Sequence, residues 1–230
     1  MTIAKPTRLR IDHLVTLEPL TNAQGEVFKA WKDGFNLCLS GSAGTGKTFI
    51  CMYLALMEVL DKDTPYDKLI IVRSAVPTRD MGFLPGKKEE KEAAYLDPYK
   101  IICTDLFDDS EAWNKLITWK NIEFLTTSYI RGVTLDNAII LVDESQNCTY
   151  HELCSIITRV GFNCKFMMCG DYYQTDFTRK DDQSGIIEFM NILDHMKWFS
   201  HVQFSWEDIV RSDFVRDFIM TKEMIESGKI

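Results

Sequence analysis

The sequence has no stretch of about 18 consecutive uncharged apolar residues, which a membrane-spanning helix needs, so we expect no membrane contact. Its first residues also lack the apolar core of a secretory signal. The seven cysteines include no C-x-x-C pair, and their odd number and irregular spacing are typical of reduced thiols. We therefore expect a cytoplasmic protein whose cysteines are mostly buried.

An excess of positive charge is missing as well. Lysine and arginine number 26 against 34 aspartates and glutamates, so the formal net charge is −8. This balance argues against a protein surface that is basic throughout and binds nucleic acid, although it leaves room for a local basic strip. No internal repeat or low-complexity segment is evident. With 230 residues, 46% of them apolar, we interpret residues 1–230 as a single domain with an ample core.

Short apolar runs recur along the chain and are mostly separated by helical stretches. Continuously apolar runs of this length are typical of strands buried on both faces of a parallel sheet. The predicted fold class is therefore α/β, with three layers and a mostly parallel central sheet. The predicted strands are 35–39, 68–73, 122–126, 138–142, 165–169 and 201–204.

The segment from Ser74 to Trp119 joins two of these strands and is too long for an ordinary crossover. We interpret it as a helical insertion on the rim of the domain, where functional loops gather. Its charged run at 87–92 has two open interpretations. It is either a solvated helix face or part of a loop that follows a nucleic-acid backbone, with nearby aromatics for stacking. The residues concerned are Phe83, Lys87, Lys88, Lys91 and Tyr95.

The most informative motif is GSAGTGKT at Gly41 to Thr48, which matches G-x-x-x-x-G-K-[ST] between an apolar run and a helical one. Its glycines let backbone N–H groups turn toward phosphates, and a helix N-terminus adds positive charge. Lys47 would reach the β- and γ-phosphates, and the Thr48 hydroxyl would hold Mg²⁺. The predicted nucleotide-binding residues of this segment are Ser42, Ala43, Gly44, Thr45, Gly46, Lys47, Thr48 and Phe49.

Acidic and amide side chains follow two later strands. Asp143 and Glu144 end the run at 138–142, as in a Walker B motif. Asp143 would hold the Mg²⁺ water shell beside Thr48, and Glu144 would polarise the attacking water. Gln174 follows the next strand and would contact the γ-phosphate or that water, unless it belongs to an ordinary polar turn. Lys47, Glu144 and Gln174 are therefore predicted catalytic residues.

These three motifs, GSAGTGKT, LVDESQN and CGDYYQTD, resemble motifs I, II and III of superfamily 1 helicases. The chain is more closely similar to the PhoH-like P-loop ATPases, whose fold is RecA-like. Four further segments resemble that family, at 81–86, 129–138, 158–162 and 207–211. The resemblance runs from about Pro19 to the end of the chain. Ser42, Val133 and Ser145 depart from the family pattern, and the extra N-terminal domains of some relatives have no counterpart, so we expect a bare PhoH core.

The resemblance implies ATP and Mg²⁺ as ligands and adds two site residues. Gln24 stands where superfamily 1 enzymes have a glutamine that pairs with adenine; the alternative is an exposed helical residue behind an N-cap at Thr21. Arg211 follows the last strand, where it would neutralise charge on the γ-phosphate, unless it forms a surface salt bridge. Arg131 and Arg159 are rival candidates for that role.

A superfamily 1 helicase holds ATP between two RecA-like domains, and this chain has room for one. We therefore expect a ring of identical chains, a hexamer, in which a neighbour supplies the arginine in trans. The family resemblance implies RNA or single-stranded DNA as the second partner. Two alternatives stay open: an ATP-dependent switch or adaptor for a protein partner, and a nuclease or small-molecule kinase.

Overall fold

The fold is known from a computed structural model of the chain. The structure describes residues 6–74, 88–130, 132, 134–171, 180–226 and 228. Residues 88–94 and 180–184 are described by their backbone alone.

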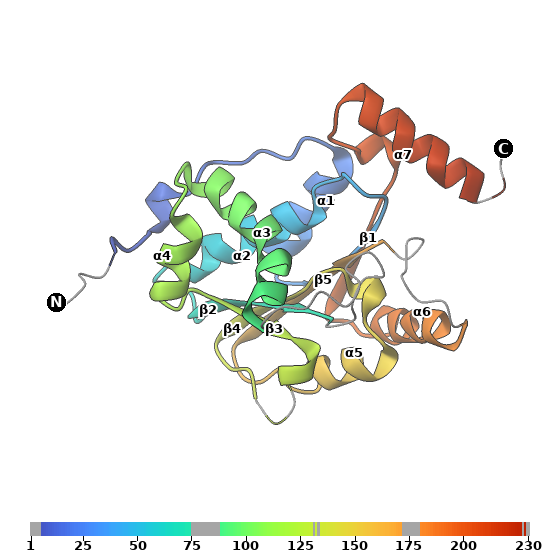
Figure 1. Cartoon of the computed structure of the whole chain (residues 1–230). Coiled ribbons are helices and arrows are strands. Elements are labelled where there is room, and N and C mark those ends of the chain that lie inside the picture. Colours follow the sequence, from blue (N-terminus) through green and yellow to red (C-terminus); the bar gives the residue numbers. More distant parts are fainter. Residues whose placement is uncertain are drawn as a thin grey trace.

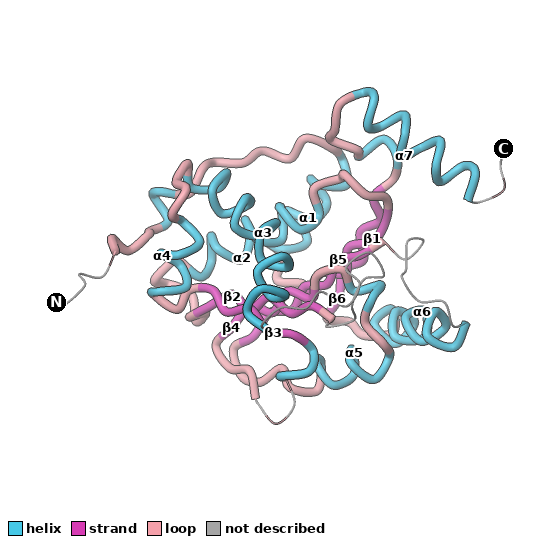
Figure 2. Tube along the Cα trace, viewed as in Figure 1, coloured by secondary structure: helices cyan, strands magenta, loops and turns pink. Residues whose placement is uncertain are grey.

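The centre of the molecule is a sheet of six strands in the order β3-β2-β4-β5-β1-β6 (Figure 2). Every pair of neighbouring strands is parallel. Each predicted strand is present, so the α/β class and the parallel sheet are confirmed. The strands are β1 (Asn36–Gly41), β2 (Lys68–Arg73), β3 (Ile122–Thr126), β4 (Ala138–Val142), β5 (Cys164–Gly170) and β6 (Phe199–Phe204).

Helices cover both faces of the sheet and make the predicted three layers (Figure 1). One face carries α1 (Asn22–Lys32), α2 (Lys47–Val59), α3 (Lys88–Phe107) and α4 (Ala112–Thr118). The other face carries α5 (Tyr150–Ile157) and α6 (Lys180–Asp194). Each face buries its own apolar cluster against the sheet. No helix in the described ranges is long and apolar enough to span a bilayer.

The remaining elements are short or peripheral. Helices α3 and α4 occupy the long connection between β2 and β3, where the sequence predicts helices. The last helix, α7 (Asp213–Glu226), projects beyond the sheet and has no buried residue among those described. The 3₁₀ turns are η1 (Ile11–His13), η3 (Thr127–Tyr129), η4 (Ser145–Asn147) and η5 (Trp206–Asp208).

The strand order determines which loops meet. Strand β5 lies between β1 and β4, with Ser40 opposite Gly170 and Val142 opposite Met168. All three strands are parallel, so their carboxyl ends open at one edge of the sheet. The loop after β1 and the acids after β4 therefore lie on either side of the end of β5.

Candidate functional site: a phosphate loop facing paired acids

The loop between β1 and α2 has the conformation that its glycines allow. Gly44 and Gly46 have φ of +75° and +84°, in the left-handed region that favours glycine. Gly46 is the N-cap of α2, so the loop leads directly into the helix N-terminus at Lys47. Backbone N–H groups and the positive end of the helix dipole together make this an anion site.

Lys47 is folded over its own loop. Its Nζ donates to the carbonyl oxygens of Gly41 at 2.8 Å and Ser42 at 2.7 Å, and to Thr45 Oγ1 at 3.2 Å. Burial lowers the pKa of this ammonium, although nearby acids raise it in part. A phosphate group would compete with these loop oxygens for the ammonium donors, since an anion makes the stronger hydrogen bond.

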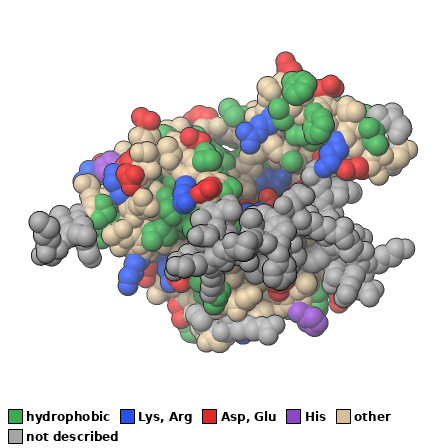
Figure 3. Space-filling model, viewed as in Figure 1, with side chains coloured by type: hydrophobic (Ala, Val, Ile, Leu, Met, Phe, Trp, Pro, Cys, Tyr) green, Lys and Arg blue, Asp and Glu red, His purple; other side chains and the backbone are tan. Residues whose placement is uncertain are grey.

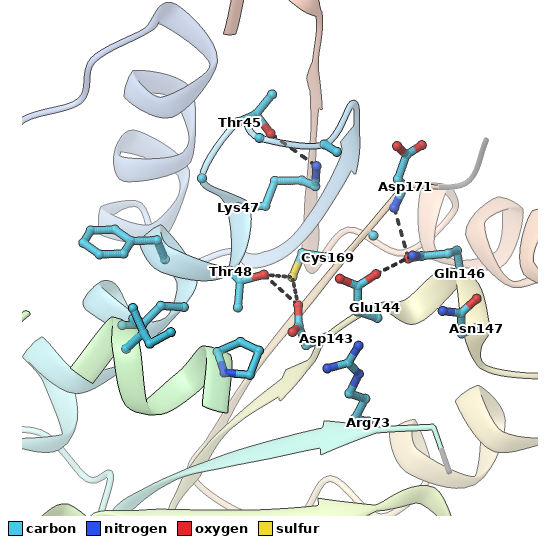
Figure 4. Close-up of a pocket in the computed structure, with 18 of the residues that line it drawn as sticks. Thr45, Lys47, Thr48, Arg73, Asp143, Glu144, Gln146, Asn147, Cys169 and Asp171 are labelled. Atoms are coloured by element: carbon cyan, nitrogen blue, oxygen red, sulfur yellow. Dashed lines mark hydrogen bonds between the residues drawn. The ribbon is translucent and has the colours of Figure 1, made fainter. Parts of the chain in front are cut away.

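Thr48 and Asp143 meet across the sheet edge, and Figure 4 shows their side chains facing each other with Cys169 between. Thr48 Oγ1 donates to Asp143 Oδ1 at 2.8 Å, and Cys169 Sγ donates to the same oxygen at 3.0 Å. A hydroxyl and a carboxylate are hard oxygen donors of the type that Mg²⁺ prefers. A hydrogen bond with Cys51 and burial raise the pKa of the Cys169 thiol, which leaves it a donor at neutral pH. The donor set therefore fits magnesium.

Glu144 follows directly and occupies a strained position, with φ of +50°. Gln146 Nε2 donates to its carboxylate. Burial, and after it the charge of Asp143, raises the pKa of Glu144 above its ordinary value. A half-buried carboxylate of raised pKa beside a phosphate site has the chemistry of a general base.

Arg73 is a site residue that the sequence interpretation missed. It ends β2, lines the pocket and points toward the two acids in Figure 4. Burial alone would lower the pKa of Arg73, but Tyr99 and Asp143 outweigh that effect and the net pKa lies above the usual value. No local sequence pattern indicates this role, because it depends on β2 lying beside β4 in the sheet.

Around these residues lies a pocket of about 720 Å³, within the size range of small-molecule sites. All predicted loop residues from Ala43 to Phe49 line it, together with Asp143, Glu144 and Arg211. Further lining residues, to which the sequence interpretation gave no individual role, come from α3, η4, β5 and the position directly after β5. They are Pro98, Ile101, Ile102, Asp105, Gln146, Asn147, Cys169, Gly170 and Asp171.

Two predicted nucleotide-binding residues lie behind the loop instead of on the pocket wall. Gln24 is 4% exposed; its amide donates to the Thr45 carbonyl at 3.2 Å and accepts from the Leu20 N–H at 2.7 Å. Ser42 Oγ donates to Glu223 of α7 at 3.0 Å. Both side chains support the loop in this structure, and contact of Gln24 with adenine stays a prediction.

The other predicted site residues, one glutamine and three arginines, differ in whether the structure describes them and whether they line the pocket. Gln174 and Arg131 lie outside the described residues. Arg159 donates from Nε to the Ile130 carbonyl at 2.7 Å, away from the pocket. Arg211 does line the pocket, and a Cβ added at Gly44 would lie 3.0 Å from its Cγ. Arg211 therefore lies against the phosphate loop of its own chain.

Gln146 provides a side-chain amide at the carboxyl edge of the sheet, the edge where the sequence predicts Gln174. It reaches from η4 to the end of β5, where its Oε1 accepts from the Asp171 N–H at 3.0 Å. Its Nε2 donates to the carboxylate of Glu144. The two bonds connect Glu144 to the start of the loop after β5.

A phosphate loop, a helix N-terminus, a Thr48–Asp143 pair and a parallel sheet define a P-loop NTPase of the RecA-like class. The family model described as PhoH-like protein matches residues 16–223. The chain belongs to the PhoH-like family. The predicted resemblance is thus confirmed.

Several curated relatives carry the same family description. The PhoH-like protein of Synechocystis sp. is 34% identical over 85% of this chain and 58% of its own length. The PhoH-like protein of Bacillus subtilis is 32% identical over 86% of this chain and 61% of its own. Protein PhoH of Escherichia coli is 31% identical, with 83% and 53% covered. The chain thus spans little more than half the length of these relatives.

Among solved structures, the chain is similar to Pif1 from Bacteroides sp. The unliganded form has a TM-score of 0.47 and 16% identity over 93% of this chain and 47% of that one. The form bound to single-stranded DNA has a TM-score of 0.49 and 14% identity, with the same shares covered.

Proposed function

We propose that this P-loop NTPase binds ATP with Mg²⁺ in the pocket and hydrolyses it. The observation that carries the proposal is the 2.8 Å contact between Thr48 Oγ1 and Asp143 Oδ1, directly below the phosphate loop. A phosphate loop alone would bind any anion. The hydroxyl–carboxylate pair adds the hard oxygen donors that a magnesium–triphosphate complex needs.

Each residue has a role that follows from its position. Lys47 and the loop N–H groups bind and orient the phosphates, and Thr48 with Asp143 would hold the magnesium ion. When bound, that ion would neutralise charge on the β- and γ-phosphates. Glu144, whose raised pKa suits a base, would take a proton from the attacking water. Arg211, over its own loop, would bind phosphate oxygens in the same chain.

The proposal extends to a ring of identical chains, with the predicted hexamer as its size. Support comes from α7, whose exposed side carries Phe214, Phe218 and Ile225, which are 83%, 63% and 59% exposed. Their spacing puts them along one stripe of the helix, away from the side that touches the phosphate loop. Figure 3 shows the apolar side chains gathered over this helix. An apolar stripe beside an open nucleotide site is suited to a second copy of the chain.

We further propose that ATP hydrolysis acts on RNA or single-stranded DNA. The support is the lysine-rich start of α3 (Lys88 and Lys91), on the helix whose later residues line the pocket. The acidic net charge of −8 predicts weak, salt-sensitive binding. The alternative function, a switch for a protein partner, would use the same ATP site without a nucleic-acid track.

The test is ATP turnover with and without single-stranded RNA and DNA oligonucleotides, on protein whose mass in solution is measured with and without ATP. The proposal predicts magnesium-dependent turnover, an assembly larger than a monomer and stimulation that decreases as salt increases. Turnover without stimulation would favour the switch. Absence of magnesium-dependent ATP binding would overturn the proposed function itself.

A further inference from the structure

Besides Thr48 and Cys169, the Asp143 carboxylate has a third hydrogen-bond partner, which comes from α3. Tyr99 of α3 donates its hydroxyl to Asp143 Oδ2 at 2.7 Å. The other oxygen, Oδ1, accepts from Thr48 and Cys169. Both oxygens of the carboxylate are therefore held, and one of them is held by the inserted helix.

The Tyr99 ring is fixed by its surroundings. The residue is fully buried, its ring stacks on Trp113 of α4 with centroids 6.4 Å apart, and it packs against Phe124 of β3 at 5.8 Å. Burial raises the pKa of Tyr99 well above its usual value, so the hydroxyl keeps its proton and can donate.

Arg73 completes this arrangement. Its guanidinium faces the same pair of residues, because Tyr99 and Asp143 raise the pKa of Arg73 against the effect of burial. The Arg73 guanidinium also lies over the Tyr95 ring, 5.3 Å from its centroid, which adds a second contact with α3. Arg73 of β2 thus packs against the helix that carries Tyr99.

We propose that Tyr99 is a positioning residue for Asp143, holding the carboxylate in the orientation that binds magnesium with the nucleotide. The inference rests on the proposed ATP site and adds the inserted helix to it. Outer partners of a metal ligand fix its orientation, and their loss commonly costs 10- to 100-fold in metal affinity. A ligand that displaced α3 would move this hydroxyl away from Asp143 and weaken the magnesium site.

The test compares wild type with Tyr99→Phe, which keeps the packed ring and removes the hydroxyl. Binding of a fluorescent ATP analogue is measured in EDTA and over a magnesium titration. The expected result is a magnesium midpoint raised about 10- to 100-fold, with affinity in EDTA unchanged. Tyr53→Phe is the matched control, since that buried hydroxyl bonds only weakly to the Leu17 N–H at 3.4 Å, and it should behave as wild type.

Arg73→Lys provides a second variant if Tyr99→Phe proves unstable in thermal unfolding. It keeps a positive charge but loses the guanidinium, so the magnesium midpoint should rise in the same direction by a smaller factor. An unchanged midpoint in Tyr99→Phe, or an equal loss of affinity with and without magnesium, would overturn the positioning role. Wild type without any magnesium-dependent binding would instead overturn the proposed ATP site, and the inference with it.

Discussion

The two sides of the proposed nucleotide pocket, the proposed metal side around Asp143 and the α7 side around Arg211, differ in how completely the chain covers them. On the metal side, Asp143 is buried and both its oxygens accept hydrogen bonds from named partners. On the opposite side, Arg211 is exposed and α7 leaves Phe214 and Phe218 in solvent. The chain thus builds the metal side from its own core, whereas its α7 side has an apolar surface to which another molecule can bind.

Substitutions on the two sides should therefore act in different ways, one within a chain and the other between chains. Substitutions on the metal side should alter chemistry in an isolated molecule. Substitutions on the exposed side of α7 should act through assembly. Ile219 and Glu223, on the other side of α7, lie against the phosphate loop. Helix α7 therefore connects the surface proposed for assembly with the proposed nucleotide site.

Glu144→Gln should have the largest effect, because it removes the proposed base from the metal side. Turnover is expected to fall by up to about 10⁴-fold while ATP affinity stays near that of wild type. Single-turnover hydrolysis and equilibrium nucleotide binding measure the two quantities. Glu123→Gln, at an acid paired with Lys68 far from the pocket, serves as control. A variant that still turns over at the wild-type rate would remove Glu144 from the mechanism.

Arg211→Ala should lower turnover by about 10³-fold, the lower end of what an arginine at the γ-phosphate contributes. Because Arg211 lies against its own Gly44, mixing this variant with an inactive Lys47→Ala variant should restore no activity. Recovery in the mixture would show that the arginine serves a neighbour's site and would contradict its placement in the same chain.

Gly44→Ala tests the packing of the phosphate loop against Arg211 and against Ile219 of α7. The left-handed φ of +75° and the nearby Arg211 Cγ, at 3.0 Å from an added Cβ, both oppose the substitution. We expect the free energy of unfolding to fall by about 1–2 kcal/mol. Denaturant unfolding measures the change, with Gly25→Ala, at a helical glycine in open space, as the matched control. An equal effect in both variants would argue against the contact.

The double change Phe214→Ser and Phe218→Ser should have the smallest effect on the chain itself. Both rings are exposed, so the free energy of unfolding should change by less than about 0.5 kcal/mol per site. The mass in solution, measured by light scattering, should fall if α7 contacts a second copy. Ile187→Ser, at an exposed isoleucine of α6, should leave the mass unchanged. A double variant that assembles like wild type would exclude this stripe as the interface.

The sequence predicts the strands and the phosphate loop well because both are local patterns. Continuous apolar runs indicate buried strands, and GSAGTGKT contains its loop and helix start in eight consecutive residues. Arg73 and Tyr99 escaped prediction for the opposite reason. Their contacts depend on β2 lying beside β4 and on how α3 packs, which no local run of residues encodes. Contact of Gln24 with adenine stays a prediction, because its amide also suits the loop carbonyl to which it donates in this structure.

The strand order has a consequence for synthesis of the protein. Among the strands that the structure describes, β1 pairs with β5 and β6, which begin at Cys164 and Phe199. A nascent chain that has just exposed the phosphate loop therefore has no neighbours on which to form that strand. Pairing over such separations is slow, and unpaired strand edges favour aggregation. A nucleotide bound at the phosphate loop would therefore stabilise the fold only after β5 and β6 had been synthesised.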